Sequence, residues 1–229
     1  GVQTCALPIF AGLEKAKPAM EYLRDAGVGC GVRITIGEFN LSQLASIIGV
    51  IENAGLKRFA VCQHIEGSDW KAVKEERREI IDFLIDYAMK NPEMEVVTEQ
   101  LYDDGVYLLQ RVAEHEPELA VEMEKLLARQ GGCPAGDRIV NVDYRGNVHL
   151  CPYWQYRTIG NIREQKLSDI CFDEEDEILA MMKDKTQHLK GKCGRCMHKH
   201  LCRGCGARAE EMCGDLFGTD PACYLTEEE

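Results

Sequence analysis

The chain has 229 residues, of which 45% are hydrophobic, so it can bury the core of one large domain or two small ones. Its net charge of -12 and pI near 5.0 argue against a nucleic-acid partner, which would select a basic surface. The sequence has neither an apolar run of about 18 residues nor a basic-then-apolar leader, which predicts a cytoplasmic protein without a membrane partner.

The N-terminal stretch differs in character from the rest of the chain. Residues 1–9 read Gly-Val-Gln-Thr-Cys-Ala-Leu-Pro-Ile, which matches one reading frame of a common sequencing-library adapter, and no initiator methionine precedes them. We therefore expect residues 1–10 to be an artefact and exclude Cys5 as a ligand. This expectation implies that the natural gene begins further upstream, and a genomic reading frame that encodes these residues would contradict it.

Helical and strand patterns alternate through residues 11–101. Apolar side chains recur at helical spacing in three segments, and shorter apolar or alternating segments lie between them. The expected helices are 13–26, a segment capped by Asn40 and ended by Gly55, and 70–89; the expected strands are 32–36, 58–65 and 94–99. Such alternation predicts an α/β fold with a parallel sheet.

The next segments predict two helices and then a hairpin. Both helices lie in residues 103–130, with Pro117 opening the second and a Gly-Gly pair closing it. Residues 139–150 are typical of two antiparallel strands that turn at an Arg-Gly pair. Such a hairpin would bring Cys133 and Cys151 together at its base.

Cysteine is the most informative residue type, since 12 thiols in a chain kept in the reducing cytosol are typical of metal binding. Seven of them form the pattern C-x12-G-x4-C, C-x2-C-x5-C-x2-C and C: Cys133, Cys151, Cys193, Cys196, Cys202, Cys205 and Cys223. Thiols at such spacing serve disulfides, zinc or iron-sulfur clusters. A closed zinc site takes four ligands, whereas a pair of clusters can leave one iron open, so seven cysteines favour clusters, with zinc as the alternative.

Other candidate residues have weaker signals. Cys30 and Cys62 flank or lie in expected strands and are interpreted as packed small hydrophobes. Cys171, at an expected helix start, and Cys213 are each candidates for a missing cluster ligand. His64 ends an expected strand, where a barrel places its site, and is a candidate substrate contact.

The cysteine pattern resembles the SPASM extension of radical S-adenosylmethionine enzymes, whose seven cysteines hold two auxiliary 4Fe-4S clusters beside a partial (β/α)6 barrel. Two residues, Arg203 and Gly204, precede the sixth cysteine where the family usually has three. This shorter form is similar to the branch that includes alternative haem and haem d1 biosynthesis enzymes. Further similarity to that branch lies in residues 31–36, 104–108, 131–132, 146–149, 160–164, 207–209 and 220–226.

The resemblance implies an α/β architecture in three parts. Residues 11–101 would be the C-terminal half of the radical S-adenosylmethionine barrel, residues 102–132 a helical bridge, and residues 133–229 a small cysteine-rich α+β SPASM domain. Arg33 and Thr35, on the fourth barrel strand, would contact the carboxylate and ribose of S-adenosylmethionine. The alternative for Arg33 is an ion pair with a neighbouring acid.

The resemblance also implies two groups of ligands for the clusters. The second auxiliary cluster would be closed by four thiolates, those of Cys193, Cys196, Cys202 and Cys223. The first would be held by three, those of Cys133, Cys151 and Cys205, with one iron open. Relatives in the haem branch often lack cysteine in the hairpin, so Cys133 and Cys151 are a departure from that branch.

The whole enzyme implied by the resemblance would cleave S-adenosylmethionine reductively to a 5′-deoxyadenosyl radical. That step uses a third 4Fe-4S cluster on a C-x3-C-x2-C loop, which does not occur in these 229 residues, so we expect no turnover from this chain alone. The implied substrate is a tetrapyrrole or a cofactor under maturation, with a peptide as the alternative, and the electron donor is a ferredoxin or flavodoxin. A binding or electron-transfer module stabilised by zinc or clusters is the alternative outside enzymes.

Overall fold

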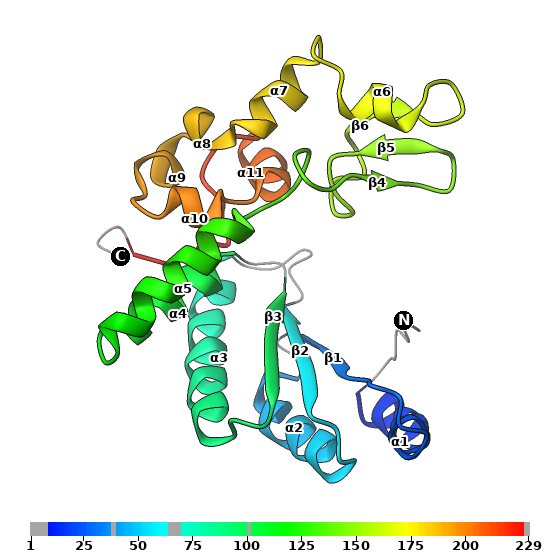
Figure 1. Cartoon of the computed structure of the whole chain (residues 1–229), viewed down its shortest axis with the longest axis vertical. Helices are drawn as coiled ribbons and strands as arrows, with labels where there is room; N and C mark the ends of the chain where they lie inside the picture. Colours follow the sequence, from blue (N-terminus) through cyan, green and yellow to red (C-terminus); the bar gives the residue numbers. More distant parts are fainter. Residues whose placement is uncertain (1–8, 38–39, 64–69, 100–101, 227–229) are drawn as a thin grey trace. The chain divides into compact units, whose positions relative to one another are not determined.

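The computed structural model describes residues 9–37, 40–63, 70–99 and 102–226 (Figure 1). The chain divides into two compact units, residues 1–100 and residues 101–229, and each is described by itself. Within the described ranges, no helix combines the length and the apolar character that a membrane crossing needs.

The first unit is built on a 3-stranded parallel sheet with the strand order β1-β2-β3 (Figure 1). Helices alternate with these strands along the chain, which confirms the predicted pattern. The elements are α1 (Ile9–Asp25), β1 (Val32–Ile36), the 3-10 helix η1 (Leu41–Gln43), α2 (Leu44–Asn53), β2 (Arg58–Gln63), α3 (Trp70–Lys90) and β3 (Glu95–Glu99).

Buried apolar side chains explain why these segments pack as parallel strands covered by helices. In the middle strand, β2, Phe59 and Val61 are fully buried, and in β1 Ile34 and Ile36 face the same core. The helices contribute buried residues at helical spacing, among them Leu44, Ile47, Ile48 and Ile51 of α2 and Ile80, Ile81 and Leu84 of α3.

Asn40 does not have the role predicted for it. No side-chain capping bond to the following helical turn is made by Asn40, and α2 begins only at Leu44 after the 3-10 turn. Instead, the buried Asn40 amide donates to the Thr35 carbonyl at 2.8 Å and accepts from the Gly37 N–H at 2.9 Å. An Asn side chain that bonds its own neighbouring backbone competes with capping, and here it fixes the end of β1.

The second unit begins with the predicted pair of helices, α4 (Asp103–Ala113) and α5 (Pro117–Gln130). Pro117 occupies the first turn of α5, where a missing N–H leaves no bond unmade. Gly131 ends the helix with a φ of 66°, a left-handed conformation that glycine adopts without steric cost.

A small antiparallel sheet follows, with the strand order β4-β5-β6. β4 (Asn141–Val142) and β5 (Asn147–His149) form the predicted hairpin, whereas β6 (Thr158–Asn161) is a third strand that the sequence pattern did not predict. The Asp143 carboxylate shapes the turn by accepting from the N–H groups of Arg145 at 2.8 Å and Asn147 at 2.9 Å.

Short helices form the rest of the second unit. They are α6 (Leu167–Cys171), α7 (Glu177–Lys183), α8 (Lys185–His188), α9 (Gly191–Arg195), α10 (Lys199–Cys202) and α11 (Gly206–Cys213). They pack with the hairpin loops around one apolar cluster, which contains Cys133, Ala135, Leu150, Cys151, Trp154, Leu179, Met182, Ala207 and Phe217. Two of the seven patterned cysteines therefore belong to the core itself.

Candidate metal centre

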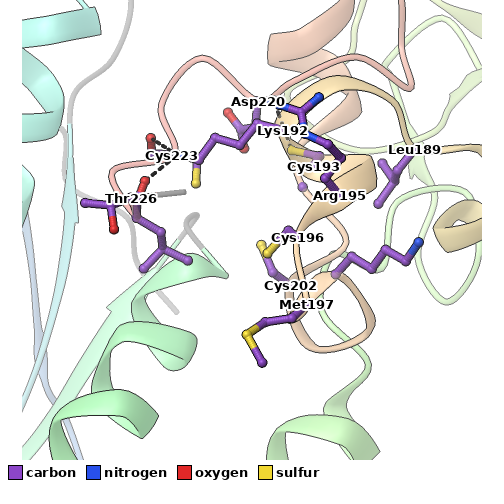
Figure 2. A pocket seen from close by; sticks show the side chains of 13 residues that line it. Leu189, Lys192, Cys193, Arg195, Cys196, Met197, Cys202, Asp220, Cys223 and Thr226 are labelled. Atoms are coloured by element: carbon purple, nitrogen blue, oxygen red, sulfur yellow. Dashed lines mark hydrogen bonds between the residues drawn. The ribbon is translucent and has the colours of Figure 1, made fainter. Parts of the chain in front are cut away.

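Four cysteines of the second unit line one cavity of about 380 Å³. Cys193 lies in α9, Cys196 caps the end of that helix, Cys202 is the last residue of α10, and Cys223 lies in the C-terminal loop. Figure 2 shows these side chains around the cavity, together with that of Asp220. The structure therefore brings together the thiols of the predicted second group, which we call the cavity cysteines.

The other walls of the cavity carry apolar and positively charged side chains. Leu189 and Met197 supply apolar surface. The Lys192 ammonium donates to the carbonyl oxygens of Cys223 and Leu225, so it ties the C-terminal loop to α9. Apolar surface and a bound cation beside thiols suit an anionic, thiolate-held group.

Three of the four cavity thiols, those of Cys193, Cys202 and Cys223, are poor acids in this environment. Burial raises the pKa of Cys193 and of Cys202, and the charge of Asp103 raises that of Cys202 further. Burial also raises the pKa of Cys223 to about 12, again with Asp103 contributing, while Lys192 acts in the opposite direction. These thiols are consequently protonated near neutral pH, and any metal they bind must displace their protons.

The three cysteines of the predicted first group lie together in the apolar core, and we call them the core cysteines. Cys133 and Cys151 belong to the buried cluster, and Cys205 packs against it. Burial raises the pKa of Cys151 and, to about 12, that of Cys205, and a charge on Cys133 raises both further, as expected of neighbouring thiols. The predicted meeting of Cys133 and Cys151 beside the hairpin is thus observed.

A close backbone contact joins the two groups of cysteines. The Cys133 N–H donates to the Cys202 carbonyl at 3.0 Å. The preceding residue, Gly132, has a φ of 60°, and a Cβ atom there would lie 2.3 Å from the Cys202 carbonyl oxygen. Only glycine allows this approach of the two chain segments.

The buried pair Asp220 and Arg208 also connects both groups. Arg208 donates to the Asp220 carboxylate through Nε at 2.8 Å and through Nη2 at 2.6 Å. The same carboxylate accepts from the Cys205 N–H at 2.9 Å, and the Asp220 N–H donates to Cys193 Sγ at 3.3 Å. Although burial raises the pKa of Asp220, Arg208 lowers it below the usual value, so the carboxylate stays ionised.

Across the described ranges, no three or more Cys, His, Asp or Glu side chains converge closely enough to hold a single metal ion. A mononuclear zinc site needs its sulfur atoms at about 2.3 Å from one point. The cavity cysteines instead surround a volume, with thiols in different walls. All-thiol donors around a cavity fit an iron-sulfur cluster in chemistry and in arrangement.

Arg33 and Thr35, the predicted contacts of S-adenosylmethionine, lie in β1 of the first unit on its exposed face. Arg33 Nε forms an ion pair with Glu99 Oε2 of β3 at 2.6 Å, which is the alternative contact expected for it. The Thr35 hydroxyl lies 3.3 Å from Cys62 Sγ. Both residues therefore remain accessible from solvent on the same face of the strand.

The remaining candidates have mixed outcomes. Cys62 is 1% exposed, which confirms its prediction as a packed small residue, and Cys30 is partly buried. Cys171 ends α6, so its placement at a helix start was wrong. Cys213 is exposed at the end of α11. His64, like Cys5, lies outside the described residues.

Three polar residues near the thiols were missed by the sequence reasoning: Arg208, Asp220 and Lys185, all buried. Single charged residues in loops and short helices have no periodicity that would mark them as buried. The only sequence signal was the similarity of residues 207–209 and 220–226 to the haem-related branch, and that similarity did not indicate what these side chains do.

Comparison with known proteins finds an iron-sulfur family that matches part of this unit and two relatives that match most of the chain. Residues 133–197 match the SPASM family, an iron-sulfur cluster-binding domain. The chain is 31% identical to the Fe-coproporphyrin III synthase of Methanosarcina barkeri over 96% of this chain and 60% of that protein. It is 30% identical to the pre-heme d1 synthase of Dinoroseobacter shibae over 95% of this chain and 57% of that protein. The chain thus spans about three fifths of the length of these relatives.

Solved structures share the fold. SuiB of Streptococcus suis, bound to S-adenosylmethionine, matches with a TM-score of 0.62 at 17% identity over 93% of this chain and 49% of SuiB. SuiB bound to the precursor peptide SuiA matches with a TM-score of 0.64 at 16% identity, over 93% of this chain and 48% of that one. This likeness, together with the domain at 133–197, confirms the predicted fold class.

Proposed function

We propose that this chain is part of a SPASM-domain enzyme of the radical S-adenosylmethionine type, related to the enzymes of haem biosynthesis. The whole protein would be an oxidoreductase or maturase that acts on a tetrapyrrole or in cofactor maturation. The named relatives support this substrate class, because they are a synthase of Fe-coproporphyrin III and a synthase of pre-heme d1. The present chain supplies the part that binds auxiliary clusters.

The observation that carries the proposal is the grouping of the seven cysteines. The cavity cysteines would close one 4Fe-4S cluster, and the core cysteines would hold another with three thiolates. Two clusters are supported by the presence of two separate groups of thiols, joined through the Cys133 to Cys202 backbone contact. When bound, such clusters supply one-electron chemistry whose potential depends on charge, burial and hydrogen bonds to sulfur.

The protein's own residues would prepare these sites in three ways. Lys192 holds the C-terminal loop against α9, so Cys223 is kept beside the other cavity thiols. Leu189 and Met197 would supply apolar surface beside the thiols. The Asp220 N–H donates to Cys193 Sγ, a bond that stabilises a thiolate more than a thiol.

The barrel unit would bind S-adenosylmethionine through Arg33 and Thr35. A guanidinium suits the carboxylate of this cofactor, but Arg33 now pairs with Glu99, so binding would require this ion pair to open or to be shared. These 229 residues contain no C-x3-C-x2-C loop. For this reason we expect the chain by itself to cleave no S-adenosylmethionine.

The whole protein would receive its electrons from a ferredoxin or flavodoxin in a reducing, cytoplasmic setting, which keeps its many free thiols available. Its net charge of -12 disfavours nucleic acid as a partner.

A peptide is the second candidate substrate, supported by the shared fold with SuiB, which has been solved with the peptide SuiA. A purely electron-transferring or zinc-stabilised module is the candidate outside enzymes, and an upstream C-x3-C-x2-C loop in the gene would contradict it.

Iron, acid-labile sulfide and zinc should be measured on the anaerobically reconstituted chain. We expect about eight iron and eight sulfide per chain, the content of two four-iron clusters. Cys202→Ser should remove about half of the iron, because it breaks the closed set of cavity thiols. The matched control is Cys30→Ser, at a partly buried position in the first unit, which should leave the iron content unchanged. Stoichiometric zinc with little iron would refute the assignment.

A further inference from the structure

Lys185 is a buried cation without an acidic partner. Its side chain is 1% exposed at the start of α8, and its Nζ donates to the Gly204 carbonyl at 2.9 Å. In the described part of the chain, that carbonyl is its hydrogen-bond acceptor and no carboxylate lies within ion-pairing distance of the ammonium. Lysine is almost never fully buried unless its charge is paired, because moving an ammonium out of water is strongly unfavourable. The ammonium therefore lacks a counter-charge in the metal-free protein.

The two other buried cations of this unit differ from Lys185 in this respect. Arg203 contacts the Asp137 carboxylate at 2.6 Å, and Arg208 contacts that of Asp220 at 2.6 Å. Both pairs bring an acid to the buried guanidinium, as buried charges require. The contact of the Lys185 ammonium is instead an uncharged carbonyl oxygen, that of Gly204.

The position of Lys185 places its charge between the cavity cysteines and the core cysteines. Its acceptor, Gly204, directly precedes Cys205, and a Cβ atom on Gly204 would lie 3.2 Å from Cys193 Sγ. Gly204 thus lies beside Cys193 of the cavity cysteines and directly before Cys205 of the core cysteines, and its carbonyl holds the ammonium.

We propose that the Lys185 ammonium is a shared counter-charge for both auxiliary clusters and raises the reduction potential of each. The proposal rests on the assignment of two clusters above. Thiolate-held four-iron clusters carry net negative charge, and net charge is one of the factors that set their potentials. Reduction adds a further negative charge, so a nearby cation stabilises the reduced form more than the oxidised form.

The test is an electrochemical titration, followed by electron paramagnetic resonance, of the full chain reconstituted with ferrous iron and sulfide. Lys185→Met removes the charge at similar volume and should shift the midpoint potentials of both clusters to more negative values. Lys185→Arg keeps the charge and should stay close to the parent chain. Lys183→Met removes an exposed charge two residues away and should shift neither potential. A Lys185→Met chain with unchanged potentials, or with a shift at one cluster only, would overturn the proposal.

Thermal unfolding provides a second readout that does not depend on potentials. In the metal-free chain Lys185→Met should raise the melting temperature, because it removes an uncompensated buried charge. In the loaded chain it should lower the melting temperature relative to the parent. If Lys185→Met destabilised both forms equally, Lys185 would be only a structural contact to Gly204, and the proposal would fail.

The iron content of the parent chain distinguishes a failure of the proposed function from a failure of the Lys185 proposal. A parent chain without clusters refutes the proposed function. If the parent chain holds both clusters and Lys185→Met leaves their reduction potentials unchanged, only the shared counter-charge is refuted. Loss of iron from Lys185→Met but not from Lys185→Arg supports a need for the charge, whereas loss from both variants contradicts it.

Discussion

At the scale of single residues, buried charges decide how the second unit is held together. Asp220 accepts four hydrogen bonds, from Arg208 twice and from the N–H groups of Cys205 and Ala222. These bonds hold segments that carry cysteines, since Cys205 is itself a donor and Ala222 directly precedes Cys223. A buried carboxylate that is fully bonded fixes its neighbours more sharply than apolar contacts do.

Asp143 offers a residue-scale test by pH. Burial raises its pKa, but hydrogen bonds from Asn147, Arg145 and His149 outweigh that effect and lower it to about 2, from an ordinary value of 3.8. A lowered folded-state pKa means that the ionised carboxylate stabilises the turn above pH 3.8 and that this stabilisation is lost as the pH falls towards 2. Asp143→Asn should therefore lower the melting temperature at pH 7 and have a smaller effect near pH 2.

Thermal unfolding of the metal-free chain across this range provides the measurement. Glu164→Gln, at an exposed carboxylate just after β6, is the control and should show no such pH dependence. An Asp143→Asn effect of the same size at pH 7 and pH 2 would mean that the hydrogen-bonding geometry of the turn matters and its charge does not.

At the scale of elements, glycines at segment ends set how closely the cysteine-bearing segments approach. Gly132 and Gly214 both have positive φ, of 60° and 70°, and both follow directly after or close to a helix end. They differ in what surrounds them. A Cβ on Gly132 would meet the backbone of Leu201 and Cys202, whereas a Cβ on Gly214 would meet nothing within 4 Å.

This contrast predicts unequal effects for the same substitution. Gly214→Ala should cost about 1–2 kcal/mol in unfolding free energy, from left-handed strain alone. Gly132→Ala should cost about 1–3 kcal/mol more, because the backbone of α10 must also move. Chemical denaturation of the two variants measures the difference, and equal effects would refute a role for the close approach. Gly132→Ala should also reduce iron loading, whereas Gly214→Ala should not.

Sequence patterns predicted some of these elements and missed others for physical reasons. The parallel sheet of the first unit was predictable because its strands are apolar and its helices amphipathic. The thiol groups were predictable because metal ligands keep characteristic spacing. β6 was missed because four residues, Thr158–Asn161, carry too short a pattern, and its pairing with β5 depends on long-range packing. The cap role predicted for Asn40 was wrong because its amide bonds the backbone at the end of β1, and Lys185 was missed because its partner is a backbone carbonyl distant in sequence.

At the scale of the whole molecule, the chain consists of two compact units, and the seven patterned cysteines all lie in the second. A ligand that binds only the folded form of a region stabilises that region against unfolding. Iron loading should therefore act unevenly along the chain. The first unit has its own sheet and its own buried apolar residues, so we expect it to fold without thiol ligands.

Hydrogen exchange of the metal-free and the reconstituted chain tests this expectation. Protection should increase across residues 133–226 on loading and remain unchanged in the strands of the first unit, 32–36, 58–63 and 95–99. The chain with Cys202→Ser should show a smaller gain, confined to the surroundings of the core cysteines. A uniform gain along the chain would show that the two units respond as one.

The order of the cysteines along the chain has a consequence for inheritance. The core cysteines, at 133, 151 and 205, and the cavity cysteines, at 193, 196, 202 and 223, interleave in sequence. No single cut of the chain separates one group from the other, because Cys205 lies between Cys202 and Cys223. Recombination between genes therefore cannot exchange one group while keeping the other. A single crossover transfers both groups or divides them, so a designer who wants only one of them must remove the other by point substitution.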